Sequence, residues 1–198
     1  MPIQVWLARM ERPLTEQEYR DMMALLPGTR RERLQKLPRE KHQEVLCAYL
    51  LLRMALWERC GWRDIPQIEV DERGKPFFPD YPDTHFSLSH TAGAAAVALA
   101  DAPVGVDIER IRPVSVRAME RIAGVRTEAA FFRNWVRREA RVKRTGSGIV
   151  TMMRTEAPLN RGEFYYEVDA FHGYAAGVAA GQSGAPRPVC HLMLDEML

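Results

Sequence analysis

The alternation of apolar and polar positions divides the chain into helices and strands that come in two similar series. The residues from Arg39 to Cys60 are apolar on most sides, as expected of a central helix, whereas Glu128 to Thr145 read as a helix with a polar face. Shorter apolar or alternating stretches are typical of strands. In chain order, we predict a strand over 3–8, helices over 16–26, 29–36 and 39–60, strands over 68–70, 85–89, 94–100 and 104–109, helices over 116–122 and 128–145, and strands near 149–154, 164–169, 175–180 and 189–194.

Local signals mark the ends of several of these elements. Thr15, followed three residues later by Glu18, has the capping-box pattern that begins a helix. Gly61 is suited to end the long central helix. The short turn sequence between the strands 94–100 and 104–109 predicts that these two strands form a hairpin.

The order of the elements predicts the fold class. Each half of the chain is helical material followed by antiparallel-looking strands, which indicates an α+β protein of two similar lobes, each with helices packed on an antiparallel sheet. We place the N-terminal lobe at 1–102 and the C-terminal lobe at 103–198. The strand 104–109 would then lie at the junction of the lobes, a favoured place for a ligand cleft.

Composition and charge narrow the class of protein. The 198 residues are 46% apolar and 27% charged, as in folded soluble proteins, and the net charge of +2 gives no general reason to expect a nucleic-acid partner. The chain has no secretory signal and no apolar run long enough to span a bilayer, which predicts no membrane partner. Its three cysteines have no CxxC spacing, which favours a reducing compartment, so we expect a cytoplasmic protein.

Two acids lie inside the apolar stretch GVDIER. In a strand, Asp107 and Glu109 would share a face, where like charges repel unless a cation lies between them. An acid-x-acid pair alone is weak evidence, because this chain has four and its composition would give about three. The apolar surroundings of Asp107 and Glu109 set this pair apart.

Further charged groups lie on the second long helix. Glu139 and Lys143 are one turn apart there, which by itself is an ordinary surface ion pair. Lys75 in a turn, and Ser89 with His90 at a strand end, can reach phosphate oxygens. A catalytic Ser–His dyad is a poor alternative, because adjacent residues of a strand point to opposite faces.

Two arginines form a fourth candidate group. Arg30 and Arg33, one helical turn apart, can grip a terminal phosphate or simply belong to a charged, solvent-facing helix. The residues alone leave both interpretations open.

Four motifs, in the same order as in a known family, contain most of these groups. From residue 74 to about 180 the chain has GKPFFPD with THFSLSHT, then PVGVDIERIRP, then WVRREARVKRTGSGI, and finally YYEVDAFHGYAAGVAA. The two central motifs, GVDIE and W-x-x-[KR]-E-A-x-x-K-x-x-G-x-G, are specific in combination. On these motifs the chain resembles the surfactin-synthetase-activating (Sfp) type of 4'-phosphopantetheinyl transferase.

The resemblance implies a fold, a reaction and a set of site residues. It implies a monomer of two pseudo-symmetric lobes that binds coenzyme A between them, transfers its phosphopantetheine to a serine of an apo acyl or peptidyl carrier protein, and releases 3',5'-ADP. By resemblance the metal ligands are Asp107, Glu109 and Glu139; the catalytic residues are Asp107, Glu139 and Lys143; and the coenzyme is held by Lys75, Ser89, His90, Arg30 and Arg33.

The implied roles agree with the chemistry of these side chains. Mg²⁺ prefers oxygen ligands and is typically held by carboxylates together with substrate phosphates; Mn²⁺ is also compatible. Glu139 can take the proton of the carrier serine, and Lys143 can stabilise charge on the leaving 3',5'-ADP. The sequence does not select a carrier. It departs from the family in four ways: a shorter 110–138 segment, Arg138 where lysine is usual, Glu44 where some members have a basic residue, and Thr91 where serine is common.

Two other functions remain open at this level. A metal-dependent phosphodiesterase could use the same three acids, although the chain has no histidine-rich metal shell and no continuous basic groove. A non-catalytic coenzyme A or nucleotide binder is disfavoured, because acids close to the phosphates would repel the ligand.

Overall fold

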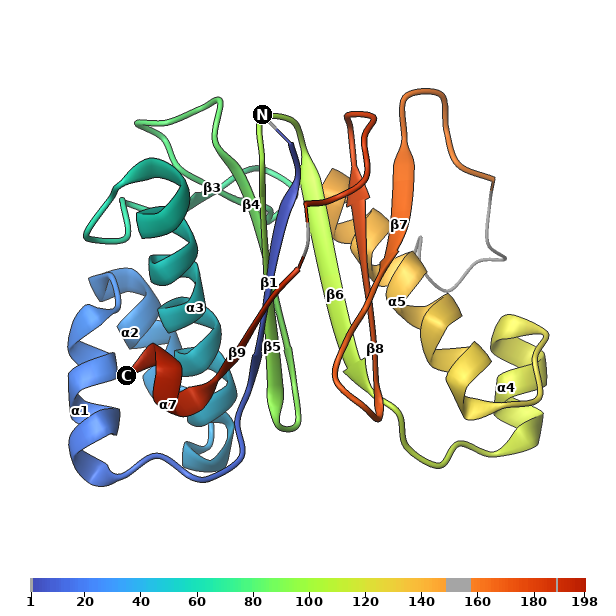
Figure 1. The fold of residues 1–198 in the computed structure, drawn as a ribbon, viewed down its shortest axis with the longest axis horizontal. Helices are drawn as coiled ribbons and strands as arrows, with labels where there is room; N and C mark the ends of the chain where they lie inside the picture. The colour runs from blue at the N-terminus through green and yellow to red at the C-terminus, as the bar shows by residue number, and fades with distance from the viewer. Residues whose placement is uncertain (1, 149–157, 188) are drawn as a thin grey trace.

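The computed structural model describes residues 2–148, 158–187 and 189–198 as two β-sheets packed face to face, with helices covering the two outer faces (Figure 1). A core of small and branched side chains, which includes Val5, Leu7, Ala96, Val106 and Val178, lies between the sheets. Period-two alternation sends the next side chains of the same strands outward against the helices. The fold therefore has four layers, in the order helix, sheet, sheet, helix.

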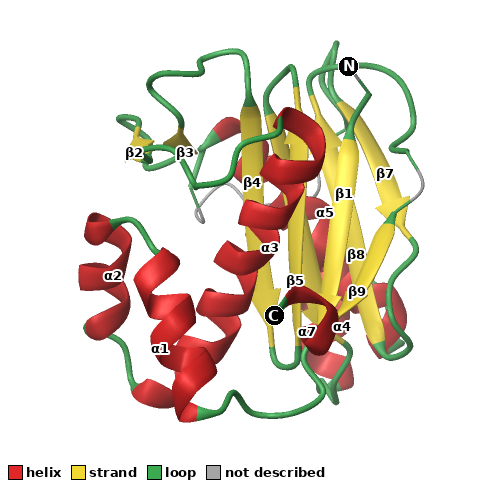
Figure 2. Ribbon diagram, turned by 60° about the vertical axis from the view of Figure 1, so that its left-hand side comes forward, coloured by secondary structure: helices red, strands yellow, loops and turns green. Residues whose placement is uncertain are grey.

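The first sheet has four strands in the order β4-β5-β1-β9. Neighbours are antiparallel except β1 and β9, which run parallel, so the prediction of a wholly antiparallel sheet was wrong for this edge. α3 packs on one face of this sheet, and α1 and α7 pack against α3 (Figure 2). The elements are β1 (Gln4–Arg9), α1 (Glu16–Leu25), α2 (Gly28–Gln35), the 3-10 helix η1 (Arg39–Lys41), α3 (His42–Cys60), β4 (His85–Thr91), β5 (Ala94–Ala100), β9 (Cys190–Met193) and α7 (Leu194–Met197).

The second sheet is antiparallel, in the order β6-β8-β7, and it packs against α5. Close packing explains Gly105, because a methyl group at this position would collide with the Ala140 carbonyl oxygen of the helix. The elements are β6 (Val104–Arg110), α4 (Val116–Ala123), α5 (Glu128–Thr145), β7 (Phe164–Val168) and β8 (Tyr174–Ala180), and a separate ribbon is formed by β2 (Glu69–Val70) and β3 (Pro76–Phe77).

The hairpin predicted between 94–100 and 104–109 does not form. β5 already pairs with β4 on one side and with β1 on the other, so it has no free edge for β6. β6 instead begins the second sheet, where it pairs with β8. The hairpin of this region joins β4 to β5 through Ala92 and Gly93, two residues that the pattern alone did not single out.

Several local predictions are confirmed. Thr15 caps α1 with the full capping box, α5 has the ends predicted for it, and Gly61 ends α3 in the left-handed conformation. The strand predicted near 149–154 lies outside the described residues. The described helices contain none that is long and apolar enough to cross a membrane.

The mixed α and β class is confirmed, with helices and antiparallel strand pairs in both halves of the chain. The pseudo-two-fold relation between two lobes, and their boundary at residue 102, stay predictions. The last elements, β9 and α7, lie against β1 and α3 of the first half (Figure 1).

Candidate functional site

The charged groups meet where the two sheets join at one side. β4 is the edge strand of the first sheet and β6 that of the second, and these two strands are in contact. Ser89 comes from β4 and Asp107 from β6, while α5 packs over β6 and brings Glu139 and Lys143 to the same place. The site therefore takes one side chain or more from each of three elements far apart in the sequence.

Lys143 is at the centre of this cluster. Its Nζ donates to Asp107 Oδ1 at 2.7 Å and to Ser89 Oγ at 2.8 Å, and Ser89 Oγ donates to Asp107 Oδ1 at 2.7 Å. Glu139, one helical turn before Lys143, has its Oε2 3.7 Å from the same ammonium. The structure thus brings together three of the predicted acid and lysine residues, Asp107, Glu139 and Lys143.

Asp107 is the most deeply buried of these charges, with a side chain only 2% exposed. Burial raises the pKa of Asp107 to about 6, and the negative charge of Glu139 adds to this rise, whereas Lys143 and Ser89 oppose it. The second carboxylate oxygen, Oδ2, is buried and has no hydrogen-bond partner among the described residues. A buried oxygen without a hydrogen-bond partner lowers the stability of the folded protein. The site is therefore incomplete at this atom, where a donor or a cation could bind.

Glu109 shares a face with Asp107, as the strand prediction required, but it has different partners. Its Oε2 accepts from Arg112 at 2.9 Å and from Thr91 Oγ1 at 3.2 Å. The two acids of GVDIER therefore each have their own cation, Lys143 for one and Arg112 for the other. Within the described part of the chain, no three carboxylate, histidine or cysteine side chains are grouped closely enough to hold a metal ion by themselves.

Lys75 also lies at the junction, where it binds backbone. Its Nζ donates to the carbonyl oxygens of Val104, at 3.0 Å, and Arg144, at 2.6 Å, and so ties the turn before β3 to the start of β6 and the end of α5. Burial lowers the pKa of Lys75 to about 8, and the nearby Arg144 charge acts in the same direction. Its predicted contact with coenzyme phosphate stays a prediction.

A cavity of roughly 460 Å³ opens beside the cluster and is lined in part by Lys75, Glu139 and Lys143. A second cavity of roughly 520 Å³ shares Arg73 and Lys75 with the first. Both volumes lie within the range of small-molecule sites. Together they give the cluster a neighbouring space that is large enough for part of a nucleotide coenzyme.

The remaining predicted coenzyme ligands lie on the α2–α3 side. The His90 ring has its Nδ1 3.7 Å from Glu44 Oε2, and partial burial lowers the pKa of His90 while the Glu44 charge opposes this. Arg30 and Arg33 on α2 lie close enough to Tyr49 of α3 to lower its pKa, although burial of the Tyr49 hydroxyl has the larger, opposite effect. Neither arginine lines the cavities beside Lys143.

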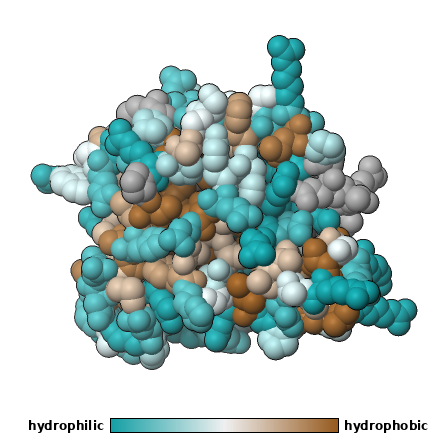
Figure 3. Space-filling view, turned by 45° about the vertical axis from the view of Figure 1, so that its right-hand side comes forward, coloured by the Kyte–Doolittle hydropathy of each residue, from teal (hydrophilic) through white to brown (hydrophobic). Residues whose placement is uncertain are grey.

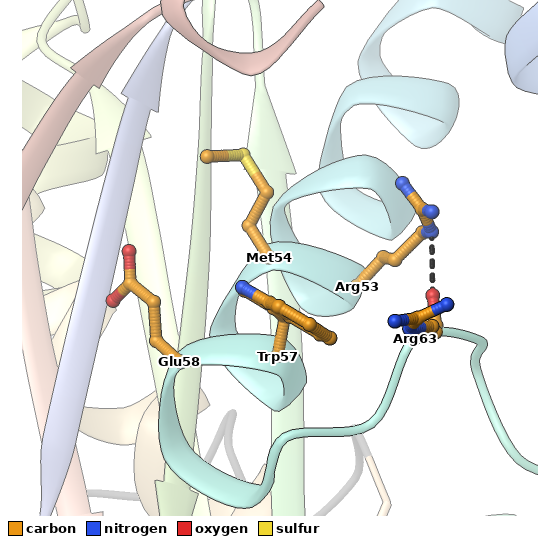
Figure 4. Close-up of a pocket in the computed structure, with 5 residues that line it drawn as sticks. All are labelled: Arg53, Met54, Trp57, Glu58 and Arg63. Atoms are coloured by element: carbon orange, nitrogen blue, oxygen red, sulfur yellow. Dashed lines mark hydrogen bonds between the residues drawn. The ribbon is translucent and has the colours of Figure 1, made fainter.

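Another hollow, of roughly 380 Å³, lies on the outer face of α3 and contains none of the predicted site residues (Figure 4). Arg53, Trp57 and Arg63 line it, and Arg53 Nε donates to the Arg63 carbonyl at 2.8 Å. It is separate in composition from the charged cluster, and we assign it no part in the site.

Sequence reasoning missed the structural use of the alternate hydroxyls on β4 and of Arg112. Ser87 and Thr91, like Ser89, point across to β6, and Arg112 neutralises Glu109. The available signal was the S-x-S-x-T spacing within HFSLSHT, which places three hydroxyls on one face of a strand.

Comparison with known proteins gives the cluster its context. No protein-family model matches the chain. The chain is 26% identical to 4'-phosphopantetheinyl transferase Sfp of Bacillus subtilis (strain 168), over 96% of this chain and 97% of that protein. It is 25% identical to 4'-phosphopantetheinyl transferase ffp of Bacillus subtilis over the same shares, and 33% identical to 4'-phosphopantetheinyl transferase AcpT of Salmonella typhi over 48% of this chain and 57% of that protein.

The structure places a lysine between two carboxylates at the junction of two sheets in a mixed α and β fold. The curated homologues then specify the class, because over nearly the full chain they are 4'-phosphopantetheinyl transferases. The resemblance to the Sfp type and the predicted enzyme class are thereby confirmed.

Proposed function

We propose that the protein transfers the 4'-phosphopantetheine group of coenzyme A to a serine of an apo carrier protein, releases 3',5'-ADP and depends on Mg²⁺. The observation that carries the proposal is the position of Lys143 between Asp107 and Glu139, the three motif residues on which the reaction would depend. The homologous transferases support the same reaction. Phosphoryl transfer needs mainly positioning and charge stabilisation, which fits a site without a nucleophile of its own.

Glu139 is the better candidate for the general base. Its side chain is 25% exposed, whereas that of Asp107 is 2% exposed and already holds two hydrogen bonds on Oδ1. A carrier serine arriving from solution can therefore reach Glu139 more easily than Asp107. The serine hydroxyl would give its proton to Glu139 as its oxygen attacks the β-phosphorus of coenzyme A.

Lys143 would stabilise the negative charge that develops on the diphosphate as the bond to 3',5'-ADP breaks. Two of its three N–H donors serve Asp107 and Ser89. Glu139 is too distant, at 3.7 Å, to accept a good hydrogen bond from the third. That third donor is available to a phosphate oxygen of the substrate.

The residues fit a magnesium ion that is bound jointly with substrate. Asp107 Oδ2 offers a buried oxygen without a partner, and Glu139 lies beside the same ammonium. Glu109 is engaged by Arg112 and Thr91, so its membership of the metal site rests on the resemblance alone. Mg²⁺ commonly takes one or two protein carboxylates and completes its shell with phosphates and water, and its charge would lower the barrier to attack on the diphosphate.

The surface next to the site supports a carrier of acidic character. From residue 110 to 137 the sequence has seven arginines and two glutamates, although the net charge of the whole chain is only +2. Several arginines are exposed around α4, beside an exposed Val116 and the half-buried Ile122. Figure 3, which brings this side of the molecule forward, shows apolar groups bordered by hydrophilic ones toward the lower right. Opposite charges favour an acidic partner surface with a small apolar centre.

The direct test is to incubate the protein with coenzyme A, Mg²⁺ and purified apo carriers of the acyl and peptidyl types. We expect a carrier mass gain of one phosphopantetheine, abolished by a chelator and by replacing the acceptor serine of the carrier with alanine. Coenzyme A binding without any mass gain would instead indicate a non-catalytic binder. Hydrolysis of a phosphodiester with no carrier modified would indicate a phosphodiesterase.

A further inference from the structure

The hollow on the outer face of α3 is built around an exposed aromatic ring. Trp57 is 52% exposed, although most of the large apolar surface of a tryptophan is normally buried. None of the residues that line this hollow lines the cavities beside Lys143, so the two places are separate. Besides Trp57, the hollow is lined by Arg53, Met54 and Glu58 of α3 and by Arg63 of the segment that follows the helix (Figure 4).

Two arginines of the hollow have N–H donors that no other group of the protein uses. Arg53 donates from Nε to the Arg63 carbonyl oxygen at 2.8 Å, which holds the segment after α3 against the helix. The two Nη atoms of Arg53 and the guanidinium of Arg63 have no hydrogen-bond partner in the described part of the chain. A guanidinium presents its donors in a plane that matches a phosphate or a carboxylate. This side of the hollow therefore suits an anionic group.

Trp57 provides a stacking surface next to these donors. The central carbon of the Arg63 guanidinium is 5.9 Å from the centroid of the Trp57 ring, which is longer than a van der Waals contact and leaves much of the ring uncovered. An open aromatic face stacks well on a nucleobase. The ring and the two arginines together fit a ligand that joins a flat base to an anionic group.

Glu58 indicates which base fits. Figure 4 shows Trp57 between Glu58 on one side and the two arginines on the other. Glu58 Oε2 accepts from the indole N–H of the buried Trp6 at 2.7 Å, which holds the carboxylate in place, and Oε1 has no partner among the described residues. An ionised carboxylate can only accept hydrogen bonds. It therefore favours a base edge with an amino group, as in adenine, and disfavours a carbonyl at that position, as in hypoxanthine.

The size of the hollow limits the ligand. Its volume of roughly 380 Å³ is near the lower end of small-molecule sites, which span about 300 to 1,000 Å³. We propose that the hollow binds an adenine mononucleotide, with the base stacked on Trp57, the 6-amino group at Glu58 and the phosphate at the two arginines. This inference does not depend on the proposed transferase function, because it uses no residue of the charged cluster.

The indole N–H of Trp57 gives a test that is specific for the hollow. Each of the four tryptophans contributes one indole signal to a nitrogen–proton correlation spectrum, and Trp57→Phe identifies the signal of Trp57. Titration with adenosine 5'-monophosphate (AMP) should shift this signal saturably, with a dissociation constant of roughly 0.5 mM. Nucleotide bound only in the cavities beside Lys143 would leave the signal in place, because Trp57 lines neither of them.

Two pairs of comparisons test the parts of the ligand. Arg53→Gln keeps a donor for the Arg63 carbonyl but removes the charge, so it should weaken AMP binding at least about tenfold. Arg20→Gln, which removes the charge of an exposed arginine on α1, is the matched control and should stay within about twofold of wild type. Inosine 5'-monophosphate (IMP) should bind the wild type at least about fivefold more weakly than AMP, and Glu58→Gln should remove this preference, because an amide can also donate.

Four results would overturn the inference. The first is a Trp57 signal that does not move at millimolar AMP. The second is equal affinity for AMP and inorganic phosphate, which would make the hollow a simple anion site. The third is equal affinity for AMP and IMP, and the fourth is an equal loss of AMP binding in Arg53→Gln and Arg20→Gln. None of these measurements uses transfer activity, so the outcome is decided even if the proposed transferase function fails.

Discussion

Two clusters in this molecule have the same composition, one cation shared by two carboxylates, and differ in their exposure to solvent. At the sheet junction Lys143 lies between Asp107 and Glu139. At the surface Arg12 bridges Glu18 of α1, at 2.8 Å, and Asp195 of α7, at 2.6 Å. The Asp107 side chain is 2% exposed, whereas that of Asp195 is 74% exposed.

Because of this difference in exposure, the pKa of the acid shifts in opposite directions in the two clusters. The Arg12 hydrogen bond lowers the pKa of Glu18 to about 2, because water already solvates both charges and little is lost by pairing them. Burial raises the pKa of Asp107 to about 6 despite its lysine partner. The surface cluster thus joins two helices, whereas the buried cluster holds the Asp107 carboxylate at a cost that its lysine partner offsets only in part.

The largest expected effect separates the two clusters by activity. Asp107→Ala and Glu139→Ala should each reduce phosphopantetheine transfer by roughly 1,000-fold or more, because they remove the preorganised charges around the reacting phosphate. Arg12→Ala should transfer at the wild-type rate. Initial rates of carrier modification, with circular dichroism to verify folding, measure the contrast; a folded Glu139→Ala protein with wild-type turnover would show that the base is misassigned.

The next largest effect is the response of the two clusters to acid pH. Transfer should fall about fivefold from pH 6 to pH 5, because most of Asp107 is then protonated and no longer pairs with Lys143. Stability should change in the opposite sense: the folded protein holds the Asp107 proton more tightly, so ionisation costs stability as pH rises from about 4 to 6. Asp107→Asn should abolish this part of the pH dependence in urea unfolding, and an unchanged profile would contradict it.

Glu18 provides the control for this predicted direction of the change in stability with pH. Its pKa is lowered in the folded state, so the stability it contributes is present above about pH 4.5 and is lost as pH falls toward 2. The destabilisation caused by Arg12→Ala should therefore shrink over the same acid interval.

The arginine-rich surface should give an intermediate effect, confined to the carrier. Arg117 and Arg121 are both exposed on α4. Replacing both by glutamate should raise KM for an acidic carrier roughly tenfold and leave KM for coenzyme A unchanged. Arg63→Glu, a charge reversal on the far side of α3, is the control. A carrier KM that responds equally to both charge reversals would argue against docking at α4.

The smallest effect belongs to the surface cluster. Arg12→Ala removes two exposed ion pairs and should lower the thermal unfolding midpoint at neutral pH by only about 1 to 3 °C. Differential scanning calorimetry measures the shift. A much larger shift would mean that α7 depends on Arg12 to dock on α3.

The sequence predicted the features that depend on residues close to one another along the chain. Thr15 with Glu18, and the ends of α5, follow from capping and helical spacing, and the i,i+4 relation of Glu139 to Lys143 needed only a helix. The acids of GVDIER were recognised because an apolar strand makes charge conspicuous. The placing of Asp107 and Lys143 in one site, however, came through the family resemblance, because no local rule joins β6 to α5.

The features that could not be predicted depend on which strand edges are already paired within a sheet. β5 and β6 look like a hairpin until β1 and β4 are seen to fill both edges of β5. The hydrogen bonds from β6 backbone N–H groups to the hydroxyls of Ser87, Ser89 and Thr91 arise only because β6 consequently begins a second sheet beside β4. The pairing of Glu109 with Arg112 could not be predicted either, because no sequence pattern links the end of β6 to the irregular segment that follows it.

The central claim, that Lys143 between two carboxylates performs phosphopantetheine transfer, is tested most directly by intact-mass measurement of an apo carrier incubated with coenzyme A and Mg²⁺. The wild type should modify the acceptor serine completely, and folded Lys143→Met should do so at least about 100-fold more slowly. No mass gain with the wild type, or equal rates for the two proteins, would contradict the account.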